Sequence, residues 1–343
     1  MVVARSGSPA QLPLWQGHGA QANRDRDARD QSARGPPGRP SPCRAAYDRP
    51  VPVLTLLTDP SRADLPPTVT EGLPRSWGPG RARWLSPGVA VQLPLAGPVR
   101  RDEEEELRAL WSARGVDAVV QPQVSRRRVL LADMDSTIVQ QECIDELAAH
   151  AGVGAEVAAI TAAAMNGELD FAQALRARVG LLAGLPTSVV DTVLAERITL
   201  TPGADQLVAT MRAHGARTAL VSGGFLPFTA DGAARVGFHE HRANVLQEED
   251  GVFTGTVLEP IVGREAKVAA LTEITASLGL TPRDAIAVGD GANDLGMLRL
   301  AGTGVALHAK PVVAEQCDVR VDHGDLTALL YLQGYSDEEI VGG

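Results

Sequence analysis

Short apolar runs that each stop at a polar residue or a glycine recur through the part of the chain after residue 126. These runs are residues 129–132, 218–221, 285–288, 304–307 and 319–321. Segments with helical periodicity lie between them. Continuous apolar strands that alternate with helices are typical of a parallel sheet whose two faces are both covered. The pattern therefore predicts an α/β fold with a doubly wound parallel sheet.

Residues 133–217 separate the first two runs, which is far more chain than a single crossover helix needs. Four segments within that stretch look helical, and they cover residues 143–151, 155–165, 170–182 and 187–198. We expect them to form a helical cap over the strand ends, from about residue 143 to residue 200. Further on, residues 243–257 alternate around Glu249-Asp250-Gly251, which predicts a β-hairpin.

Residues 49–123 predict a second, smaller α/β module. Its strand-like runs are residues 51–57, 82–85, 89–93 and 116–120, and a helix with an acidic first turn covers residues 102–111. The order strand, optional helix, strand, strand, helix, strand resembles a ferredoxin-like or ACT-like regulatory module. A purely structural or dimerising role for this module stays equally open.

The two ends of the chain differ from these modules. Residues 1–48 are rich in Arg, Gly, Pro, Ser and Gln and have no apolar period. Such a segment cannot bury enough surface to offset its ordering entropy, so we expect a disordered tail. We expect the parallel-sheet domain to cover residues 127–335, and residues 336–343 to form a short second tail.

The charge balance excludes some classes of partner. The chain has 42 acidic residues and 32 Lys plus Arg, which gives a net charge of −10 and argues against a nucleic-acid partner. No apolar run approaches the roughly 18 residues that a membrane span needs, so we expect no membrane partner. Three scattered cysteines are too few for a disulfide framework and favour a reducing compartment, which predicts a cytoplasmic location.

Polar residues directly follow the predicted strands. Asp133 and Asp135 come after residues 129–132, where both carboxylates would project into the crevice at the strand end. One could act as a nucleophile and metal ligand there, and the other as an acid and base. Ser222 and Gly223 follow the next run, where a hydroxyl and bare backbone N–H groups can bind an anion.

Two further signals complete the set. Lys267 stands at a predicted helix start, and Lys267 and Lys310 are the only lysines in a chain whose other cations are arginine. A lysine under such a bias can indicate a site that needs a compact ammonium group. Asp290, Asn293 and Asp294 share a glycine turn after the third apolar run, and their oxygens suit Mg²⁺.

Each motif alone has an ordinary explanation as a polar loop, a plain turn or a solvated charge. Together they supply a nucleophile, an acid and base, phosphate donors and a metal site, three of the four motifs at strand ends of one sheet. Phosphoryl transfer needs this complement, because positioning and charge neutralisation carry most of its catalysis. The conjunction therefore predicts an enzyme of phosphoryl transfer.

The motif set resembles the haloacid-dehalogenase superfamily of aspartyl-phosphate phosphatases, and within it the members that act on phosphoserine. The matching segments are residues 133–137, 165–171, 175–179, 222–225 and 289–294, within residues 127–333. The resemblance implies a Mg²⁺-dependent phosphoric monoester hydrolase. Its reaction would convert O-phospho-L-serine into L-serine and phosphate through an aspartyl-phosphate, as the last step of serine biosynthesis.

The resemblance also implies roles for single residues. Asp133 would be the nucleophile and Asp135 the general acid and base. Asp133, the backbone carbonyl of Asp135 and Asp290 would hold Mg²⁺, with Asp294 in support. The implied substrate-binding residues are Glu142, Met165, Phe171, Arg178, Ser222, Gly223, Lys267 and Asn293.

The implied substrate is a small molecule with an ammonium, a carboxylate and a phosphate group. Glu142 would pair with the ammonium group, and Arg178 would fork onto the carboxylate. Met165 and Phe171 would shield the site from water. If the chain forms a homodimer, we expect the N-terminal module to make the contact.

Two other functions stay open. One is a related phosphatase or phosphotransferase that acts on another phosphorylated amino acid or small metabolite. The other is a regulatory protein whose N-terminal module senses an amino acid. Residues 239–241, His-Glu-His, could bind a metal, although partner ligands are not evident in the sequence nearby. We expect Cys143 to be a buried apolar residue rather than a nucleophile.

Overall fold

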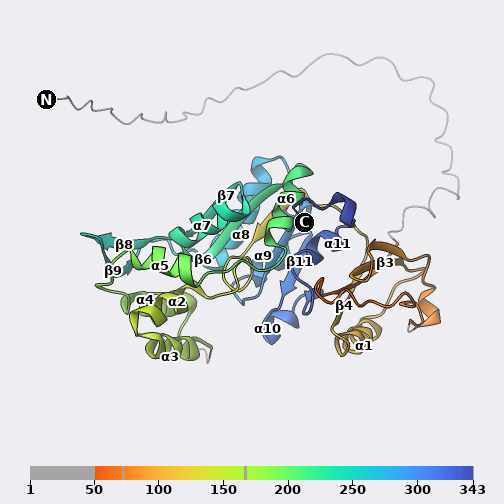
Figure 1. The fold of residues 1–343 in the computed structure, drawn as a ribbon, viewed down its shortest axis with the longest axis horizontal. Coiled ribbons are helices and arrows are strands. Elements are labelled where there is room, and N and C mark those ends of the chain that lie inside the picture. The colour runs from red at the N-terminus through yellow and green to blue at the C-terminus, as the bar shows by residue number, and fades with distance from the viewer. Residues whose placement is uncertain (1–50, 72, 166–167, 343) are drawn as a thin grey trace, which may run out of the picture. The chain divides into compact units, whose positions relative to one another are not determined.

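The computed structural model describes residues 51–71, 73–165 and 168–342 of the chain. The expected tail over residues 1–48 therefore lies outside the described residues. A four-stranded antiparallel sheet comes first along the described chain, and a six-stranded parallel sheet follows it (Figure 1). No helix among the described residues is long and apolar enough to cross a membrane.

The six-stranded sheet is parallel throughout and confirms the predicted α/β fold. In spatial order its strands are β12 (Val319–Val321), β11 (Thr303–Leu307), β10 (Ala285–Gly289), β5 (Val129–Ala132), β6 (Arg217–Phe225) and β7 (Glu240–Asn244). Five of these strands coincide with the apolar runs of the sequence. The sequence pattern does not predict β7, because this strand lies at the sheet edge and consists mostly of polar, half-buried residues.

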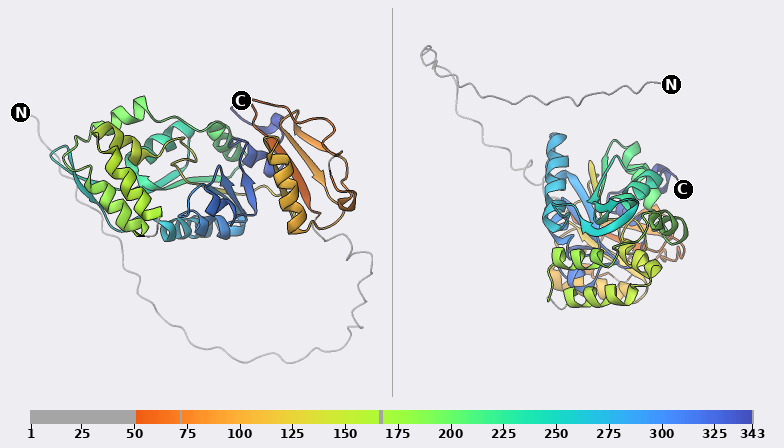
Figure 2. Two further views of the ribbon diagram at one scale, coloured as in Figure 1. Left: turned by 90° about the horizontal axis from the view of Figure 1, so that it is seen from below. Right: turned by 90° about the vertical axis from the view of Figure 1, so that its left-hand side faces the viewer.

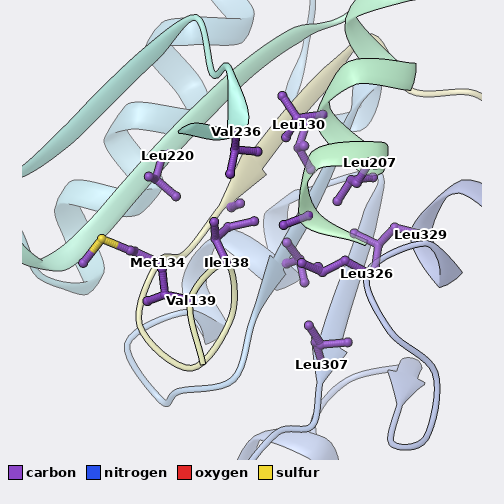
Figure 3. Close-up of a cluster of buried hydrophobic side chains, with 14 of the residues drawn as sticks. Leu130, Met134, Ile138, Val139, Leu207, Leu220, Val236, Leu307, Leu326 and Leu329 are labelled. Atoms are coloured by element: carbon purple, nitrogen blue, oxygen red, sulfur yellow. The ribbon is translucent and has the colours of Figure 1, made fainter. Parts of the chain in front are cut away.

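Helices cover both faces of this sheet, as the doubly wound prediction requires. They are α6 (Ala204–Ala213), α7 (Leu226–Val236), α8 (Arg264–Ser277), α9 (Leu295–Leu300), α10 (Pro311–Ala314) and α11 (Ala328–Leu332). Because successive side chains of a strand point to opposite faces, Val129 and Leu131 join the apolar cluster of α8 and α9. Leu130 and Leu220 instead join a second cluster with Leu207 of α6, shown in Figure 3. The two faces are thus apolar, and polar side chains gather at the strand ends.

Four helices lie between β5 and α6, and Figure 1 shows α2 to α4 side by side. They are α2 (Cys143–Ala151), α3 (Gly154–Met165), α4 (Phe171–Gly180) and α5 (Val189–Glu196). The Asp170 carboxylate accepts a hydrogen bond of 2.7 Å from the Gln173 N–H and so caps the start of α4. These four helices form the expected helical segment before β6.

The predicted hairpin is confirmed as the antiparallel strands β8 (Leu246–Glu249) and β9 (Val252–Val257). Asp250 and Gly251 form its turn, both with positive φ, as a tight two-residue hairpin requires. Phe253 in β9 makes two backbone hydrogen bonds outside the hairpin. Its carbonyl accepts the Gly184 N–H at 2.8 Å, and the Phe253 N–H donates to the Leu185 carbonyl at 2.9 Å. The hairpin is therefore bonded to the chain that joins α4 to α5.

The N-terminal module has four antiparallel strands in the order β2-β3-β1-β4. The left view of Figure 2 shows the orange helix of this module beside its orange strands. Its elements are β1 (Val53–Thr58), β2 (Arg83–Ser86), β3 (Ala90–Pro94), α1 (Arg101–Ser112) and β4 (Val116–Gln121). The sequence left open whether a helix follows the first strand of this module. The described residues between β1 and β2 contain only the short 3₁₀ helix Arg75–Trp77. Five prolines between residues 59 and 80 explain this difference, since proline breaks a helix interior. The ACT-like label stays a prediction.

Both faces of the four-stranded sheet are covered. Leu54 and Leu56 pack with Leu107 and Trp111 of α1, whereas Leu57 on the opposite face belongs to the large cluster that includes α11. Polar contacts reinforce this second face, because the Gln92 Nε2 donates to the carbonyl of Tyr331 at 2.9 Å. The N-terminal module therefore shares an apolar core with the parallel-sheet part of the chain.

Asp117 at the start of β4 makes a second link between the two modules. It is 4% exposed, and its carboxylate accepts the N–H groups of Asp322 at 2.8 Å and Gly324 at 2.8 Å. The His323 N–H also donates to it, at 3.1 Å to Oδ2. Burial raises the pKa of Asp117, and the three N–H donors oppose that shift.

The last described residues also contact the parallel-sheet part. They contain the short 3₁₀ helix Asp337–Glu339, and the Val341 N–H donates to the hydroxyl of Thr210 in α6 at 2.8 Å. The expected second tail over residues 336–343 is therefore bonded to the domain.

Candidate active site

Neighbouring strands bring the polar motifs together at one edge of the parallel sheet. β5 lies between β10 and β6, so the residues that follow β5 and β10 and those that end β6 share the same crevice. Asp133 continues the strand ladder, since its N–H donates to the Val288 carbonyl at 3.0 Å. Asp290 follows β10, and Ser222 and Gly223 lie in the last residues of β6.

The loop after β5 is fixed by the apolar residue between its two carboxylates. Met134 is fully buried in the cluster of Figure 3, and the carbonyl of Met134 accepts the N–H groups of Ile138 at 2.9 Å and Val139 at 3.0 Å. Ser136 adopts a φ of 53°, which is unusual for a residue other than glycine. Anchoring Met134 in the core leaves Asp133 and Asp135 on the crevice side.

Lys267 lies fully buried between two carboxylates. Its Nζ is 2.7 Å from Oδ1 of Asp133 and 2.6 Å from Oδ1 of Asp294. Burial alone would lower the pKa of Lys267, but the two carboxylates raise it above its ordinary value. The ammonium group therefore stays charged, and it holds Asp133 in one orientation.

Asp290 completes a cluster of three carboxylates. One oxygen from each of Asp133, Asp290 and Asp294 lies within 4.8 Å of the others. Burial, together with the charge of Asp133, raises the pKa of Asp290 to about 6. Lys267 contacts two of these acids, and the Lys310 Nζ lies 3.7 Å from Oδ2 of the third, Asp290. Two positive charges thus face three acids, and a further cation would relieve the excess. Three buried carboxylates are the donor set of a hard divalent cation, so the cluster could hold one.

Asp135 points to the other side of the same crevice. Its Oδ1 accepts the Cys143 N–H at 3.0 Å, and its Oδ2 lies 3.4 Å from the Ser222 hydroxyl. Burial raises the pKa of Asp135 to about 7, with the charge of Glu142 adding to the shift. Burial likewise raises the pKa of the Cys143 thiol, which is consistent with its expected role as a buried apolar side chain.

These residues open into a pocket of about 190 Å³. Its lining residues are Asp133, Asp135, Glu142, Ile144, Phe171, Leu175, Arg178, Gly223, Gly224, Phe225, Asp290, Gly291, Asn293 and Lys310. A Cβ on Gly223 would lie 2.9 Å from the Phe171 ring, so a larger residue at that position would push Phe171 out of the pocket. Glu142 is held by the Ser136 hydroxyl at 2.9 Å, and the Arg178 Nε donates to the Ala174 carbonyl at 3.3 Å.

Most of the residues expected from the sequence therefore meet at one pocket. Ser222, Lys267 and Asp294 are fully buried and lie behind the lining, where they contact lining residues or their neighbours. Met165 ends α3, and its side chain lies outside the described residues. Lys310 also lines the pocket, although it is not among the expected site residues. The sequence did contain a signal for it, because lysine occurs at only two positions of the chain.

The His-Glu-His sequence at residues 239–241 does not form a joint site. His239 bonds to Thr218, and His241 contacts the Thr229 hydroxyl at 3.1 Å. Within the part of the chain that the structure describes, the only cluster of potential metal-ligating side chains is that of Asp133, Asp290 and Asp294.

Comparison with known proteins identifies the family of this chain. The family model of the haloacid dehalogenase-like hydrolases matches residues 130–299. The chain is 45% identical over 257 residues to a phosphoserine phosphatase of Streptomyces coelicolor, covering 74% of this chain and 62% of that protein. It is 44% identical over 216 residues to the phosphoserine phosphatase of Haemophilus influenzae, covering 63% of this chain and 68% of that protein. The chain thus spans less than two thirds of the length of the Streptomyces relative.

Solved structures show the same likeness. A haloacid-dehalogenase family hydrolase from Salmonella enterica has a TM-score of 0.75 at 31% identity, over 82% of this chain and 98% of that one. A structure described as a phospho-aspartyl intermediate analogue of phosphoserine phosphatase has a TM-score of 0.57 at 39% identity, over 60% of this chain and 99% of that one.

Proposed function

Because the chain belongs to the phosphoserine phosphatase family of the haloacid dehalogenase-like hydrolases, we propose that it hydrolyses O-phospho-L-serine to L-serine and phosphate. The observation that carries this proposal is a single pocket that is lined by Asp133, Asp135 and Asp290. It holds one carboxylate for covalent attack, a second for proton transfer, a candidate cation site, and Glu142 and Arg178 for an amino-acid head group.

The first step of the proposed reaction uses both carboxylates that follow β5. A carboxylate oxygen of Asp133 attacks phosphorus, so that an oxygen–phosphorus bond forms as the bond to the serine oxygen breaks. Asp135 donates its proton to that departing oxygen. Its pKa of about 7 supports this role, since both protonation states are populated near neutral pH.

The second step returns Asp133 to its starting state. Asp135, now a carboxylate, takes a proton from a water molecule whose oxygen attacks phosphorus. The bond between phosphorus and Asp133 then breaks, and inorganic phosphate is released. Lys267 supports both steps, because its buried ammonium offsets the negative charge of Asp133 and of the phosphoryl group.

We propose Mg²⁺ as the cation of the acidic cluster, held by Asp133, Asp290 and the backbone carbonyl of Asp135, with Asp294 in support. When bound, the cation would neutralise charge on the phosphoryl oxygens. Ser222, Gly223 and Asn293 would donate hydrogen bonds to the same oxygens. The Ser222 hydroxyl accepts the Gly224 N–H at 2.8 Å and donates to Oδ2 of Asp135 at 3.4 Å, a long hydrogen bond that it would exchange for one to a phosphoryl oxygen.

The amino-acid head group would lie between the sheet edge and α4. Glu142 would pair with the ammonium group and Arg178 with the carboxylate, since both line the pocket. Phe171 would cover the site beside Gly223, and Met165 remains the other proposed shielding residue. A sugar phosphate lacks both of the charges that this pair would recognise.

Release of phosphate from O-phosphoserine, O-phosphothreonine and a sugar phosphate tests the proposal. We expect phosphoserine to give the highest kcat/KM and the sugar phosphate the lowest. Equal rates on all three would contradict the proposed substrate and favour a general small-metabolite phosphatase.

The remaining expectations concern the state of the protein in the cell. We propose a cytoplasmic location, which the free cysteines Cys143 and Cys317 support. We also propose that any homodimer forms through the N-terminal module, where β2 is an outer strand of the sheet. Mass determination in solution on the full chain and on a β2-edge variant would test the second point.

A further inference from the structure

Lys310 is a second lysine at the pocket, and the proposed reaction above gives it no role. It lines the pocket, and its side chain is 49% exposed. Its Nζ lies 3.7 Å from Oδ2 of Asp290, a separation longer than a hydrogen bond. The ammonium group therefore lies near the reacting end of the pocket, where it forms a long ion pair with Asp290 and not a hydrogen bond.

The backbone of Lys310 is fixed, although its side chain is half exposed. The Lys310 N–H donates to the Asp290 carbonyl at 3.3 Å, and its own carbonyl accepts the N–H groups of Val313 at 2.8 Å and Ala314 at 3.0 Å. Two residues earlier, His308 has a φ of 44° and its ring contacts the Gly324 carbonyl at 2.8 Å. This loop follows β11, so it directs Lys310 from a neighbouring strand end toward Asp290.

Lys267 cannot supply a mobile positive charge to this pocket. It is fully buried, it lies behind the lining, and two of its three N–H donors are directed at Asp133 and Asp294. Among the described residues that line the pocket, the only cations are Arg178, on α4, and Lys310. Arg178 is assigned to the substrate carboxylate, so Lys310 is the lining side-chain cation that remains for the phosphate end.

The charge of the ligand decides what Lys310 would bind. Four carboxylates line the pocket, and a phosphate monoester adds up to two more negative charges at its reacting end. A compact ammonium on a flexible stem can follow a phosphoryl oxygen as the phosphate is transferred and released. A half-exposed ammonium group in a long ion pair with Asp290 fits that requirement.

We propose that the Lys310 ammonium group binds a phosphoryl oxygen of the substrate and the same group in the released inorganic phosphate. The inference rests on the proposed function for the identity of the substrate, but it makes a separate claim about phosphate binding. Lys310 then acts on the phosphate end alone, whereas Glu142 and Arg178 act on the amino-acid end.

Binding of inorganic phosphate and of L-serine to the full chain in the presence of Mg²⁺, measured by calorimetry, tests this division. Lys310→Met removes the charge and keeps most of the stem, and Lys310→Arg keeps the charge. Arg176→Met is the matched control, because Arg176 is a half-exposed cation that pairs with Glu259 at 2.6 Å outside the pocket lining.

We expect Lys310→Met to weaken phosphate binding about tenfold and to leave serine binding unchanged, since one charge-assisted hydrogen bond is lost. Lys310→Arg should stay within about threefold of the parent, and Arg176→Met should match the parent for both ligands. Equal melting temperatures would show that all variants are folded.

Unchanged phosphate affinity in Lys310→Met would overturn the inference, as would an equal loss of phosphate and serine affinity. These outcomes differ from a failure of the proposed function. That failure would be a parent protein that binds phosphate but releases none from O-phosphoserine, and calorimetry needs no turnover to detect binding.

Discussion

The candidate active site and the junction between the two modules each bury a charged side chain, but they balance the charge differently. At the pocket, Lys267 meets two carboxylates, and Asp290 brings a third acid that Lys267 does not contact directly. At the junction, Asp117 meets only backbone N–H groups, and both of its oxygens accept hydrogen bonds. The pocket therefore retains negative charge and open volume for a ligand, whereas the junction is complete as it stands.

This difference shows how to separate a functional buried charge from a structural one. A charged group whose hydrogen bonds all come from fixed backbone donors contributes to stability, and no acceptor site is left on it for a ligand. A cluster with surplus charge beside a pocket costs stability unless a ligand binds there. Variants at the two places should accordingly change different measured quantities.

Asp133→Asn should have the largest effect, because a carboxamide is a poor nucleophile. We expect kcat for O-phosphoserine to fall by about 10⁴-fold or more. Stability should change little, since the substitution keeps the shape of the side chain. Near-normal turnover in a folded Asp133→Asn protein would contradict covalent catalysis at this residue.

Lys267→Arg keeps the positive charge but should lose about 10³-fold in kcat. The site is fully buried and fits an ammonium group within 2.7 Å of both Asp133 and Asp294, so a planar guanidinium must displace one of them. Steady-state kinetics and a thermal melt would check this. Full activity would show that any cation suffices at this position.

Asp117→Ala should instead lower the free energy of unfolding by about 3 kcal/mol, since it leaves buried N–H groups without acceptors. The kcat of the protein that remains folded should stay within about twofold of the parent. Denaturant unfolding with activity per folded molecule measures both quantities, and Asp117→Asn, which keeps one acceptor oxygen, should lose less stability. A loss of kcat at unchanged stability would mean that the junction has a catalytic role.

Arg178→Ala should have the smallest of these effects. We expect the preference for O-phosphoserine over a generic aryl phosphate to fall about tenfold, while generic phosphatase activity persists. Arg176→Ala is the matched control on the same helix, because Arg176 pairs with Glu259 rather than lining the pocket. An unchanged preference in Arg178→Ala would remove this residue from the carboxylate site.

Because the two modules share an apolar core, a test for regulation by serine should keep both modules. Leu57 of β1 and Leu329 of α11 belong to the same buried cluster. Removing the N-terminal module would expose that cluster to water, so serine inhibition is better examined with point variants of the full chain than with a truncated one.

The sequence predicted the parallel sheet and the position of its polar strand ends, because buried strands are continuous apolar runs. It did not predict β7, whose polar residues at a sheet edge lack that signal. The link between Asp117 and residues 322–324 was also beyond prediction, because the partners are distant in sequence and the donors are backbone groups without a side-chain signature.

The candidate site was predictable to a similar extent. Asp133 and Asp290 each follow a predicted strand of one sheet. Their approach within 4.8 Å also depends on the strand order, in which β10 lies beside β5, and the sequence pattern does not give that order. Lys310 was not assigned to the site, because a single lysine in a loop is most simply interpreted as a solvated charge. Its position beside Asp290 depends on the backbone path after His308, which the sequence pattern does not specify.

The central claim is that acids from different strands act on one phosphoryl group through Asp133. Acid quenching of the full chain during turnover of O-phosphoserine with Mg²⁺, followed by reductive trapping and peptide mass spectrometry, tests it directly. We predict a modified carboxylate at Asp133 and loss of both the adduct and phosphate release when a chelator removes the metal. Undiminished hydrolysis with chelator, or an adduct on another residue, would contradict the account.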